Sequence, residues 1–272
     1  MKLRWYGTAS VMIESNGFKL MADPFLGIPI EENRFRRQLR AIPFRAADAV
    51  LVTHGHFDHI LDLPRLYNDS FIEIYATATP CNTLLDKGMK FSRLHWIEPG
   101  ETYEIGDFSI RVYGGRHCRF DLGVVCKTIF KAETFRNPKR LIQLLELNRE
   151  YPENGETVFY EITAEGRRIQ LMGSMGLDPA VDYPTGADAL ILPFQGTGCP
   201  AKTVMPIIER LQPKSIYLDH YDDAFPPMSD HVETATFAAQ MLAKGLPTTA
   251  MIRGKTYEIR GDMKYGKGNQ RI

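Results

Sequence analysis

Three histidines and an aspartate lie within six positions in the stretch 51–60, LVTHGHFDHI. The stretch opens with apolar residues, which predicts that a buried strand ends just before the cluster. His54 and His56 are two positions apart, so both imidazoles point to the same side of an extended segment. Asp58 and His59 follow a turn near a predicted helix start and can face the same point from another direction. Zn²⁺ readily takes imidazole nitrogen and carboxylate oxygen, with about three protein ligands plus water in catalytic sites.

A histidine-rich turn exposed to solvent is the alternative interpretation of this stretch. The chain contains only seven histidines, and three of them fall within six residues directly after a predicted buried strand. Such clustering is not expected of a solvated loop, whereas a metal site requires it. We therefore interpret the stretch 51–60 as part of a metal site.

The motif THGHFDH resembles the H-x-H-x-D-H signature of the metallo-β-lactamase superfamily, and other motifs of that family follow in order. Asp23, in LMADPFLG, resembles the aspartate of the first motif, which supports the site or the fold. His117, in GGRHCRF, stands where the family has a third histidine of its first metal site, and His220, in YLDHYDD, stands in the place of the last histidine. The resemblance spans about residues 3–260. It implies an α/β fold, a four-layer αββα sandwich of two mixed sheets flanked by helices, with the site at the edge of the sheets.

The family pattern implies two metal sites with three protein ligands each. The ligands that it implies are His54, His56 and His117 for the first site, and Asp58, His59 and His220 for the second. Zn²⁺ is the expected metal, with Mn²⁺ or iron as alternatives.

The fourth family motif departs from its usual form in this chain. The family usually has an aspartate there that bridges two metals, but the matching stretch LMGSMGLD has Ser174. A serine hydroxyl is a poor ligand for Zn²⁺. Two outcomes stay open: two metals bridged only by hydroxide, or a weak second site and one dominant metal. Asp178 is a substitute ligand or part of a turn before Pro179.

Three further polar residues near these motifs are candidates for supporting roles. Asp222 and Asp223 follow His220 closely enough to orient that histidine or to hydrogen-bond a product, with a solvated loop as the alternative. His231 lies beside the predicted start of the last helix. We expect it either at the surface or in contact with substrate.

Alternation of apolar and polar residues predicts strands over much of the chain. The expected strands lie at about 10–15, 18–24, 47–54, 71–76, 103–115, 157–174, 187–194, 215–219 and 248–259. Hairpin turns are expected at 16–17 and 165–166. The first fifty residues alternate in the manner of strands. Helices are expected from near Asp58 through Leu66, at 80–88, at 201–211, and from Asp230, with Glu233 as a capping box, to Gly245.

We expect a single domain over residues 1–272, with a helical insertion at about 131–157. The insertion carries Arg136, Lys139 and Arg140, which either attract an anionic substrate or form the solvated face of a helix. The leucines of this segment would pack on the rest of the domain, cover the site or form a contact in a homo-oligomer.

Charge and cysteine content exclude several classes of protein. The chain has 33 Lys and Arg against 33 Asp and Glu, so there is no bulk positive charge to gather nucleic acid. No apolar stretch approaches the roughly 18 residues that indicate a membrane span. The four cysteines, at 81, 118, 126 and 199, are scattered and fit a reducing cytoplasm. We expect a small-molecule substrate and a cytoplasmic location.

The resemblance implies a metal-dependent hydrolase in which a metal-bound hydroxide attacks the substrate and Asp58 orients this nucleophile or takes its proton. The opening LRWYGTASVMIES looks closest to the ascorbate-6-phosphate lactonase-like branch, which implies a small ester, lactone or phosphodiester. Mononuclear-iron sulfur dioxygenases keep the same histidine motif and are an alternative. A nuclease is disfavoured by the zero net charge. A non-catalytic metal-binding protein is a further alternative, motivated by Ser174.

Overall fold

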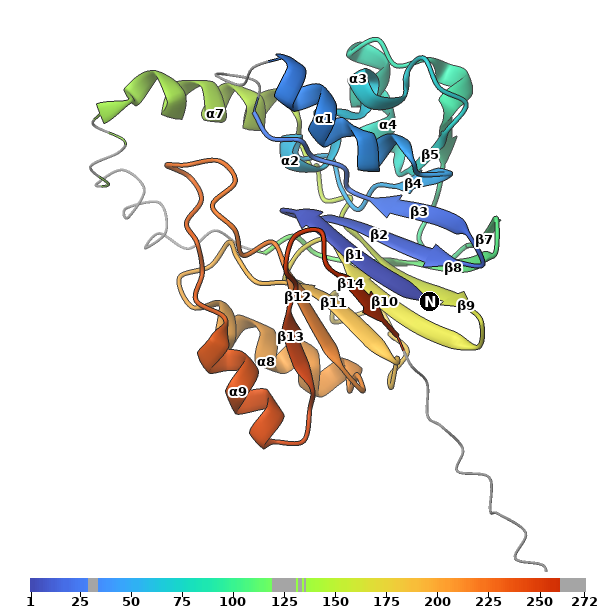
Figure 1. The fold of residues 1–272 in the computed structure, drawn as a ribbon, viewed down its shortest axis with the longest axis vertical. Coiled ribbons are helices and arrows are strands. Elements are labelled where there is room, and N and C mark those ends of the chain that lie inside the picture. The colour runs from blue at the N-terminus through green and yellow to red at the C-terminus, as the bar shows by residue number, and fades with distance from the viewer. Residues whose placement is uncertain (29–33, 119–130, 132–133, 135, 260–272) are drawn as a thin grey trace, which may run out of the picture.

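The computed structural model describes residues 1–28, 34–118, 131, 134 and 136–259. Within them, two seven-stranded sheets form the centre of the molecule, and helices cover the outer face of each sheet (Figure 1). The four-layer αββα sandwich expected from the sequence is confirmed. No helix in this part of the chain is long and apolar enough to cross a membrane.

The first sheet is built mostly from the N-terminal part of the chain. Its strand order is β14-β1-β2-β3-β4-β5-β6. The strands are β1 (Lys2–Gly7), β2 (Ser10–Ser15), β3 (Phe18–Ala22), β4 (Ala49–Leu51), β5 (Glu73–Ala76), β6 (Leu94–Trp96) and β14 (Thr256–Glu258). Pairing is antiparallel from β14 to β3 and parallel from β3 to β6.

The second sheet has the same arrangement of antiparallel and parallel strands and is built from segments that come later in the chain. Its order is β13-β12-β11-β10-β9-β8-β7. The strands are β7 (Thr102–Ile105), β8 (Phe108–Gly114), β9 (Val158–Ala164), β10 (Arg167–Met172), β11 (Ala189–Pro193), β12 (Ile216–Asp219) and β13 (Thr248–Ala250). Pairing is antiparallel from β7 to β10 and parallel from β10 to β13. In open α/β sheets, sites form outside the carboxyl ends of such parallel strands.

Helices lie on both outer faces. They are α1 (Arg34–Arg45), α2 (Phe57–Ile60), α3 (Leu63–Tyr67), α4 (Ala78–Asp86), α7 (Pro138–Glu150), α8 (Pro200–Leu211) and α9 (Ala235–Ala243), with a 3₁₀ turn at Phe91–Arg93. In Figure 1, α1 to α4 lie above the first sheet, and α8 and α9 lie below the second. α7 falls within the predicted insertion at 131–157, of which residues 132–133 and 135 lie outside the described residues.

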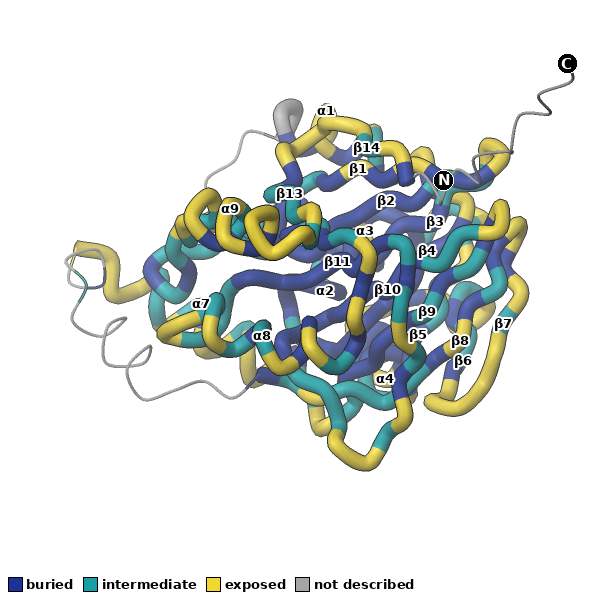
Figure 2. Tube along the Cα trace, turned by 90° about the horizontal axis from the view of Figure 1, so that it is seen from below, coloured by how far each residue is buried: buried dark blue, intermediate teal, exposed yellow. Residues whose placement is uncertain are grey.

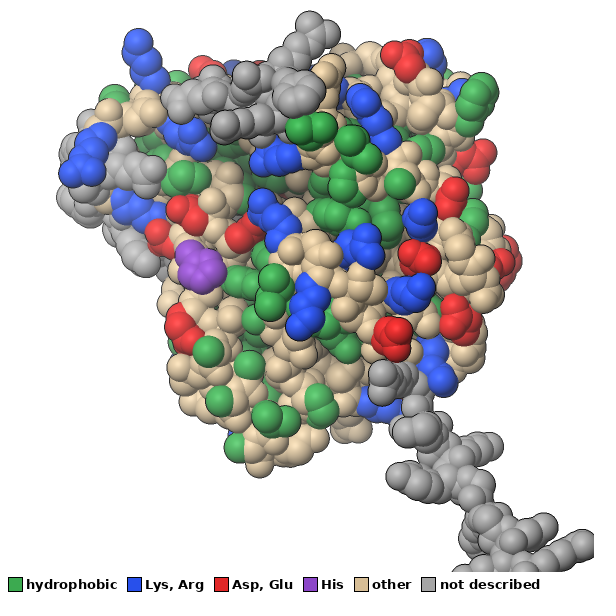
Figure 3. All heavy atoms as spheres, viewed as in Figure 1, with side chains coloured by type: hydrophobic (Ala, Val, Ile, Leu, Met, Phe, Trp, Pro, Cys, Tyr) green, Lys and Arg blue, Asp and Glu red, His purple; other side chains and the backbone are tan. Residues whose placement is uncertain are grey.

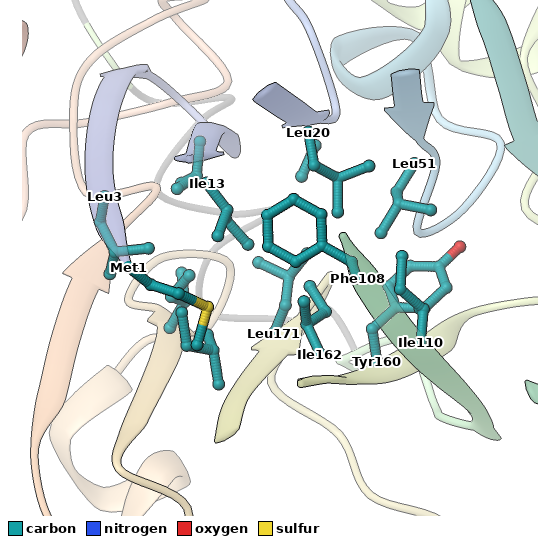
Figure 4. Packing of buried hydrophobic residues seen from close by; sticks show 14 of the residues in the cluster. Met1, Leu3, Ile13, Leu20, Leu51, Phe108, Ile110, Tyr160, Ile162 and Leu171 are labelled. Atoms are coloured by element: carbon teal, nitrogen blue, oxygen red, sulfur yellow. The ribbon is translucent and has the colours of Figure 1, made fainter. Parts of the chain in front are cut away.

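The main core lies between the two sheets and is apolar on both inner faces. Figure 4 shows Ile13, Leu20 and Leu51 from the first sheet meeting Phe108 and Tyr160 from the second. Two further clusters pack each sheet against its helices. Figure 2 shows the strands largely buried and much of α1, α7 and α9 exposed. This packing holds the strand ends in fixed relative positions.

Both predicted hairpin turns are confirmed. Asn16 and Gly17 join β2 to β3 with φ of 49° and 89°, and Glu165 and Gly166 join β9 to β10 with φ of 49° and 68°. Two successive residues with positive φ match the twist of antiparallel strands in a two-residue turn.

Three expectations about the positions of helices and strands are wrong, and a fourth concerns the start of the last helix. The strand-like first fifty residues include a helix, α1. The helix expected from Asp58 through Leu66 is two helices, because Pro64 lies in the first turn of α3 and begins a new helix. The segment 248–259 contains two strands that belong to different sheets.

The last helix begins at Ala235 rather than near Asp230. The Glu233 carboxylate accepts hydrogen bonds from the backbone N–H groups of Ala235 and Thr236, at 2.5 and 3.0 Å. Glu233 therefore satisfies the first N–H groups of α9 itself, instead of lying inside the helix as the third residue of a capping box.

The cysteines show the scattered placement that the sequence suggested. Cys81 and Cys118 are buried and Cys199 is exposed, and all three are free thiols. Cys126 lies outside the described residues.

Candidate metal centre

Six candidate ligands converge at one edge of the sandwich, although they come from three separate segments. They follow the ends of β4, β8 and β12 or lie in α2. The structure brings them together as two groups of three, which we call the first trio and the second trio. The first trio is His54, His56 and His117, and the second is Asp58, His59 and His220; the ligand atoms within each trio lie within 4.8 Å of one another.

The first trio presents imidazole nitrogens to a common point. The Nε2 atom of His54 lies 3.1 Å from Nδ1 of His56. The ring of His117 lies 4.6 Å from that of His56 and 5.1 Å from that of His54, between centroids. Nδ1 of His117 donates to the Cys118 carbonyl oxygen at 2.9 Å, so the neutral ring carries its lone pair on Nε2.

The second trio is arranged around one carboxylate. Oδ2 of Asp58 lies 3.0 Å from Nε2 of His220 and 3.6 Å from Nε2 of His59. Two ligands of a tetrahedral Zn²⁺, each at 2.0–2.1 Å, are about 3.3 Å apart. The separation of 3.1 Å between the nitrogens of His54 and His56, and those of 3.0 and 3.6 Å in the second trio, lie close to this value, so these donor atoms suit a metal of this size.

The carboxylate of Asp23 supports one histidine of each trio. It accepts hydrogen bonds from the backbone N–H of Thr53 at 2.8 Å and from the Thr53 hydroxyl at 2.6 Å. Nδ1 of His59 lies 2.9 Å from the same carboxylate. The Thr53 hydroxyl also lies 3.1 Å from Nδ1 of His54. Since that hydroxyl donates to Asp23, it accepts from His54, which directs the Nε2 lone pair of His54 toward His56.

A glycine permits this network to form beside β10. A Cβ atom on Gly173 would lie 2.2 Å from Oγ1 of Thr53, closer than any real contact. Only glycine therefore lets the end of β10 approach Thr53 so closely. This explains why the stretch LMGS has glycine before Ser174.

Burial lowers the pKa of every histidine in the first trio. The pKa of His54 falls well below its usual value, that of His56 falls to about 4, and that of His117 is also lowered. A histidine must be neutral to bind a metal. The protein therefore holds the first trio in the metal-binding form at neutral pH.

The second trio stabilises positive charge around Asp58. Burial would raise the pKa of Asp58, but His59 and His220 outweigh burial and hold that pKa below its usual value. Burial would lower the pKa of His220, yet the hydrogen bond and charge of Asp58 raise it to about 9. The pKa of His59 is likewise raised against its burial, first by Asp23. In the metal-free protein this position therefore holds positive charge as protonated histidine, and a bound metal ion would replace those protons.

Both trios form the floor of a cavity of about 540 Å³. Its walls come from α2, from the segment 195–200 before and at the start of α8, and from residues 225–233. Asn148 of α7, within the segment 131–157, also lines it. His231 is exposed and lines the cavity as well, so its two expected positions, at the surface and beside a substrate, remain compatible.

The sequence model of the beta-lactamase superfamily domain matches residues 2–218. The chain belongs to the metallo-β-lactamase superfamily. It is similar to a protein named as a metal-dependent hydrolase from Pyrobaculum arsenaticum, with 28% identity over 113 residues, which are 42% of this chain and 48% of the relative. The chain thus matches about half the length of this curated relative.

Solved structures share the fold at low sequence identity. Igni18, a metallo hydrolase from Ignicoccus hospitalis, is 17% identical with a TM-score of 0.62, over 95% of this chain and 99% of that one. CmlA, a diiron β-hydroxylase from Streptomyces venezuelae, is 13% identical with a TM-score of 0.63, over 94% of this chain and 54% of that one. A metallo hydrolase and a diiron β-hydroxylase thus share this fold.

Ser174 stands at the end of β10, where the superfamily usually has its bridging aspartate. Its side chain is buried and lines the cavity. Its hydroxyl oxygen accepts a hydrogen bond from the backbone N–H of Cys118 at 2.9 Å. Ser174 therefore fixes the segment that carries His117.

Three acidic candidates do not reach the cavity. The Asp222 carboxylate accepts from the backbone N–H of Thr8 and pairs with Arg253 at 2.7 Å. Asp223 accepts from the hydroxyl of Ser229 at 2.5 Å. Among the described residues, neither carboxylate forms the hydrogen bond to His220 that was one of the two expectations. Asp178 pairs with Arg116 and accepts from the N–H of Ala180, as in the predicted turn.

Sequence reasoning missed two residues beside the ligands. Thr53 directs His54, and its position directly before the histidine motif was the available signal. Asp219 is buried at the end of β12, next to His220, and burial raises its pKa to about 8. Its Oδ1 atom accepts no hydrogen bond within the described residues. The adjacent Asp-His pair in YLDH was the signal there.

Proposed function

We propose that this protein is a metal-dependent hydrolase that binds two divalent ions, Zn²⁺ by preference, and cleaves a small ester, lactone or phosphodiester. The observation that carries this proposal is the pair of trios at the floor of one cavity. The relative named as a metal-dependent hydrolase supports it.

The donor set fits the expected metal. Five imidazoles and one carboxylate suit Zn²⁺, and imidazole with carboxylate also accommodates iron or manganese. The first trio would hold one ion and the second trio the other. A divalent metal bound there acts as a Lewis acid and makes water nucleophilic near neutral pH.

The residues of the chain have separate tasks in this reaction. Asp58 offers a carboxylate oxygen that can accept a hydrogen bond from water and orient it, because its pKa lies low and it stays ionised. Asp23 and Thr53 keep His54 and His59 in fixed orientations. His231 and Asn148 line the cavity and are available to position the substrate.

A substrate panel tests the proposal. Metal-free protein loaded separately with Zn²⁺ and Mn²⁺ is assayed on lactones, carboxylic esters and phosphodiesters. We expect turnover of at least one class with one of the metals, and its loss on chelation. Absence of turnover on every class, in protein shown to contain metal, contradicts a hydrolase and favours a metal-binding protein without catalytic activity.

A further inference from the structure

One wall of the cavity is apolar and begins directly beside the second trio. Phe57, Phe225 and Met228 line it. The rings of Phe225 and Phe57 meet edge to face, with centroids 5.3 Å apart, and Phe225 lies 6.4 Å from the ring of His220. A group bound at the metal centre therefore has an aromatic surface next to it. We call these three residues the apolar wall.

Hydrogen bonds within the segment 223–229 hold the apolar wall in place. The backbone N–H of Phe225 donates to Oγ of Ser229 at 2.8 Å, and the Ser229 hydroxyl donates to Asp223. The N–H of Met228 donates to the carbonyl oxygen of Phe225 at 3.1 Å. The wall is thus formed before any substrate arrives, which reduces the entropy lost on binding.

Basic side chains near the cavity bind this segment and do not face the substrate space. Nζ of Lys131 donates to the carbonyl oxygens of Pro227 and Ser229, at 2.6 and 3.0 Å. Nε of Arg140 donates to the carbonyl oxygen of Pro226 at 2.7 Å. Lys131 also pairs with Asp230, at 2.8 Å. The positive charges of Lys131 and Arg140 are therefore already hydrogen-bonded to protein groups.

No lysine or arginine lines the cavity among the residues that the structure describes, whereas Asp230 and Glu233 do. Arg136, Lys139 and Arg140, which the sequence suggested as attractants for an anion, are absent from the lining. On the face seen in Figure 3, basic and acidic side chains are interspersed. Asp230 is paired with Lys131 and Glu233 accepts from the first N–H groups of α9, so within the described lining an anionic group would find no cationic side chain beside the apolar wall.

We propose that the substrate is an uncharged ester or lactone whose apolar acyl group lies against Phe57, Phe225 and Met228. This inference rests on the proposed hydrolase function and narrows it. Metal ions held by the two trios would polarise the reacting group of an ester and of a phosphodiester alike, so the side chains of the remaining walls determine which class of substrate binds. In the reaction, water adds to the acyl carbon, the acyl C–O bond breaks, and the products are a carboxylic acid and an alcohol.

Substrates with the same leaving group test the substrate class. The Zn²⁺-loaded protein is assayed on para-nitrophenyl acetate, butyrate and hexanoate and on bis-para-nitrophenyl phosphate, each corrected for its uncatalysed rate. We expect kcat/KM to rise about tenfold from acetate to hexanoate, since each buried methylene strengthens binding. A larger rate enhancement on the phosphodiester than on every ester overturns the inference while leaving the hydrolase function intact.

A binding measurement on metal-free protein tests the apolar wall without any turnover. The neutral fluorescent probe N-phenylnaphthylamine should bind in the cavity, and Phe225→Ala or Met228→Ala should weaken its binding about tenfold through lost apolar contact. Phe71→Ala is the matched control, because Phe71 is 89% exposed and lies outside the cavity lining.

The two measurements separate the possible failures. Probe affinity that is equal in wild type, Phe225→Ala and Met228→Ala overturns the apolar wall. If the two variants bind the probe more weakly than wild type but the metal-loaded protein turns over no substrate, the apolar wall is supported and the hydrolase function is contradicted. Circular dichroism confirms that each variant is folded before it is compared.

Discussion

Asp58→Asn lowers kcat/KM for the best substrate by about 10³-fold, within the roughly 10²–10⁴-fold that a positioned acid–base residue contributes. Asparagine keeps the size of the side chain but carries no negative charge. It therefore removes a candidate metal ligand, the ionised oxygen proposed to orient water, and the charged partner of His59 and His220 together. Steady-state kinetics on zinc-loaded protein measure the effect.

A matched variant separates this result from a general effect of lost charge. Asp69→Asn removes a carboxylate whose side chain is 98% exposed and should leave kcat/KM unchanged. If Asp58→Asn retained wild-type kcat/KM with its metals bound, Asp58 would have no role in the reaction.

Asp23→Ala weakens metal binding at both trios although Asp23 is not itself an expected ligand. Its carboxylate holds His59 directly and holds His54 through the Thr53 hydroxyl. Loss of such a supporting partner typically reduces metal affinity about 10–100-fold. Titration with a competing chelator measures the affinity for each of the two metal equivalents.

The same substitution destabilises the metal-free protein. It leaves the buried N–H and hydroxyl of Thr53 without their acceptor, and each such loss costs about 1–3 kcal/mol of unfolding free energy. Asp48→Ala is the control, because Asp48 accepts one exposed N–H, from Lys19 at the start of β3. Equal affinity of wild type and Asp23→Ala for both metal equivalents contradicts the supporting role of Asp23.

The candidate ligands were predictable because their signal is local. The spacing of His54, His56, Asp58 and His59 is contained in one short segment after a strand, and alternation of apolar residues predicted where most other strands end. Ligands at strand ends then converge, because parallel strands place their carboxyl ends at the same edge of a sheet. His117 and His220 were identified as ligands only through their match to family motifs.

The elements and contacts that escaped prediction depend on distant partners. α1 has a buried arginine, Arg37, whose guanidinium pairs with the buried Asp62 at 2.6 Å. A sequence rich in arginine with an internal proline, Pro43, does not indicate a helix that packs on a sheet. The pairing with Asp62, 25 residues away, and the packing of Ala41 and Phe44 supply the missing stabilisation.

The contacts of the basic side chains in the segment 131–157 could not be predicted for the same reason. Arg140 was expected either to attract an anion or to face solvent, and it does neither. Its guanidinium binds the carbonyl of Pro226, 86 residues away, and this contact supports the apolar wall. No pattern within 131–157 indicates that partner, because hydrogen bonds to backbone carbonyls leave no trace in residue type.

The central claim is that the two trios bind two metal ions although Ser174 replaces the usual bridging aspartate. The protein is saturated with Zn²⁺, freed of unbound metal by gel filtration, and its zinc content per chain is measured by elemental analysis. We predict two equivalents in the wild type and a loss of one in His117→Ala, which disrupts the first trio alone. A zinc content of one equivalent or none in the wild type would contradict the two-metal centre.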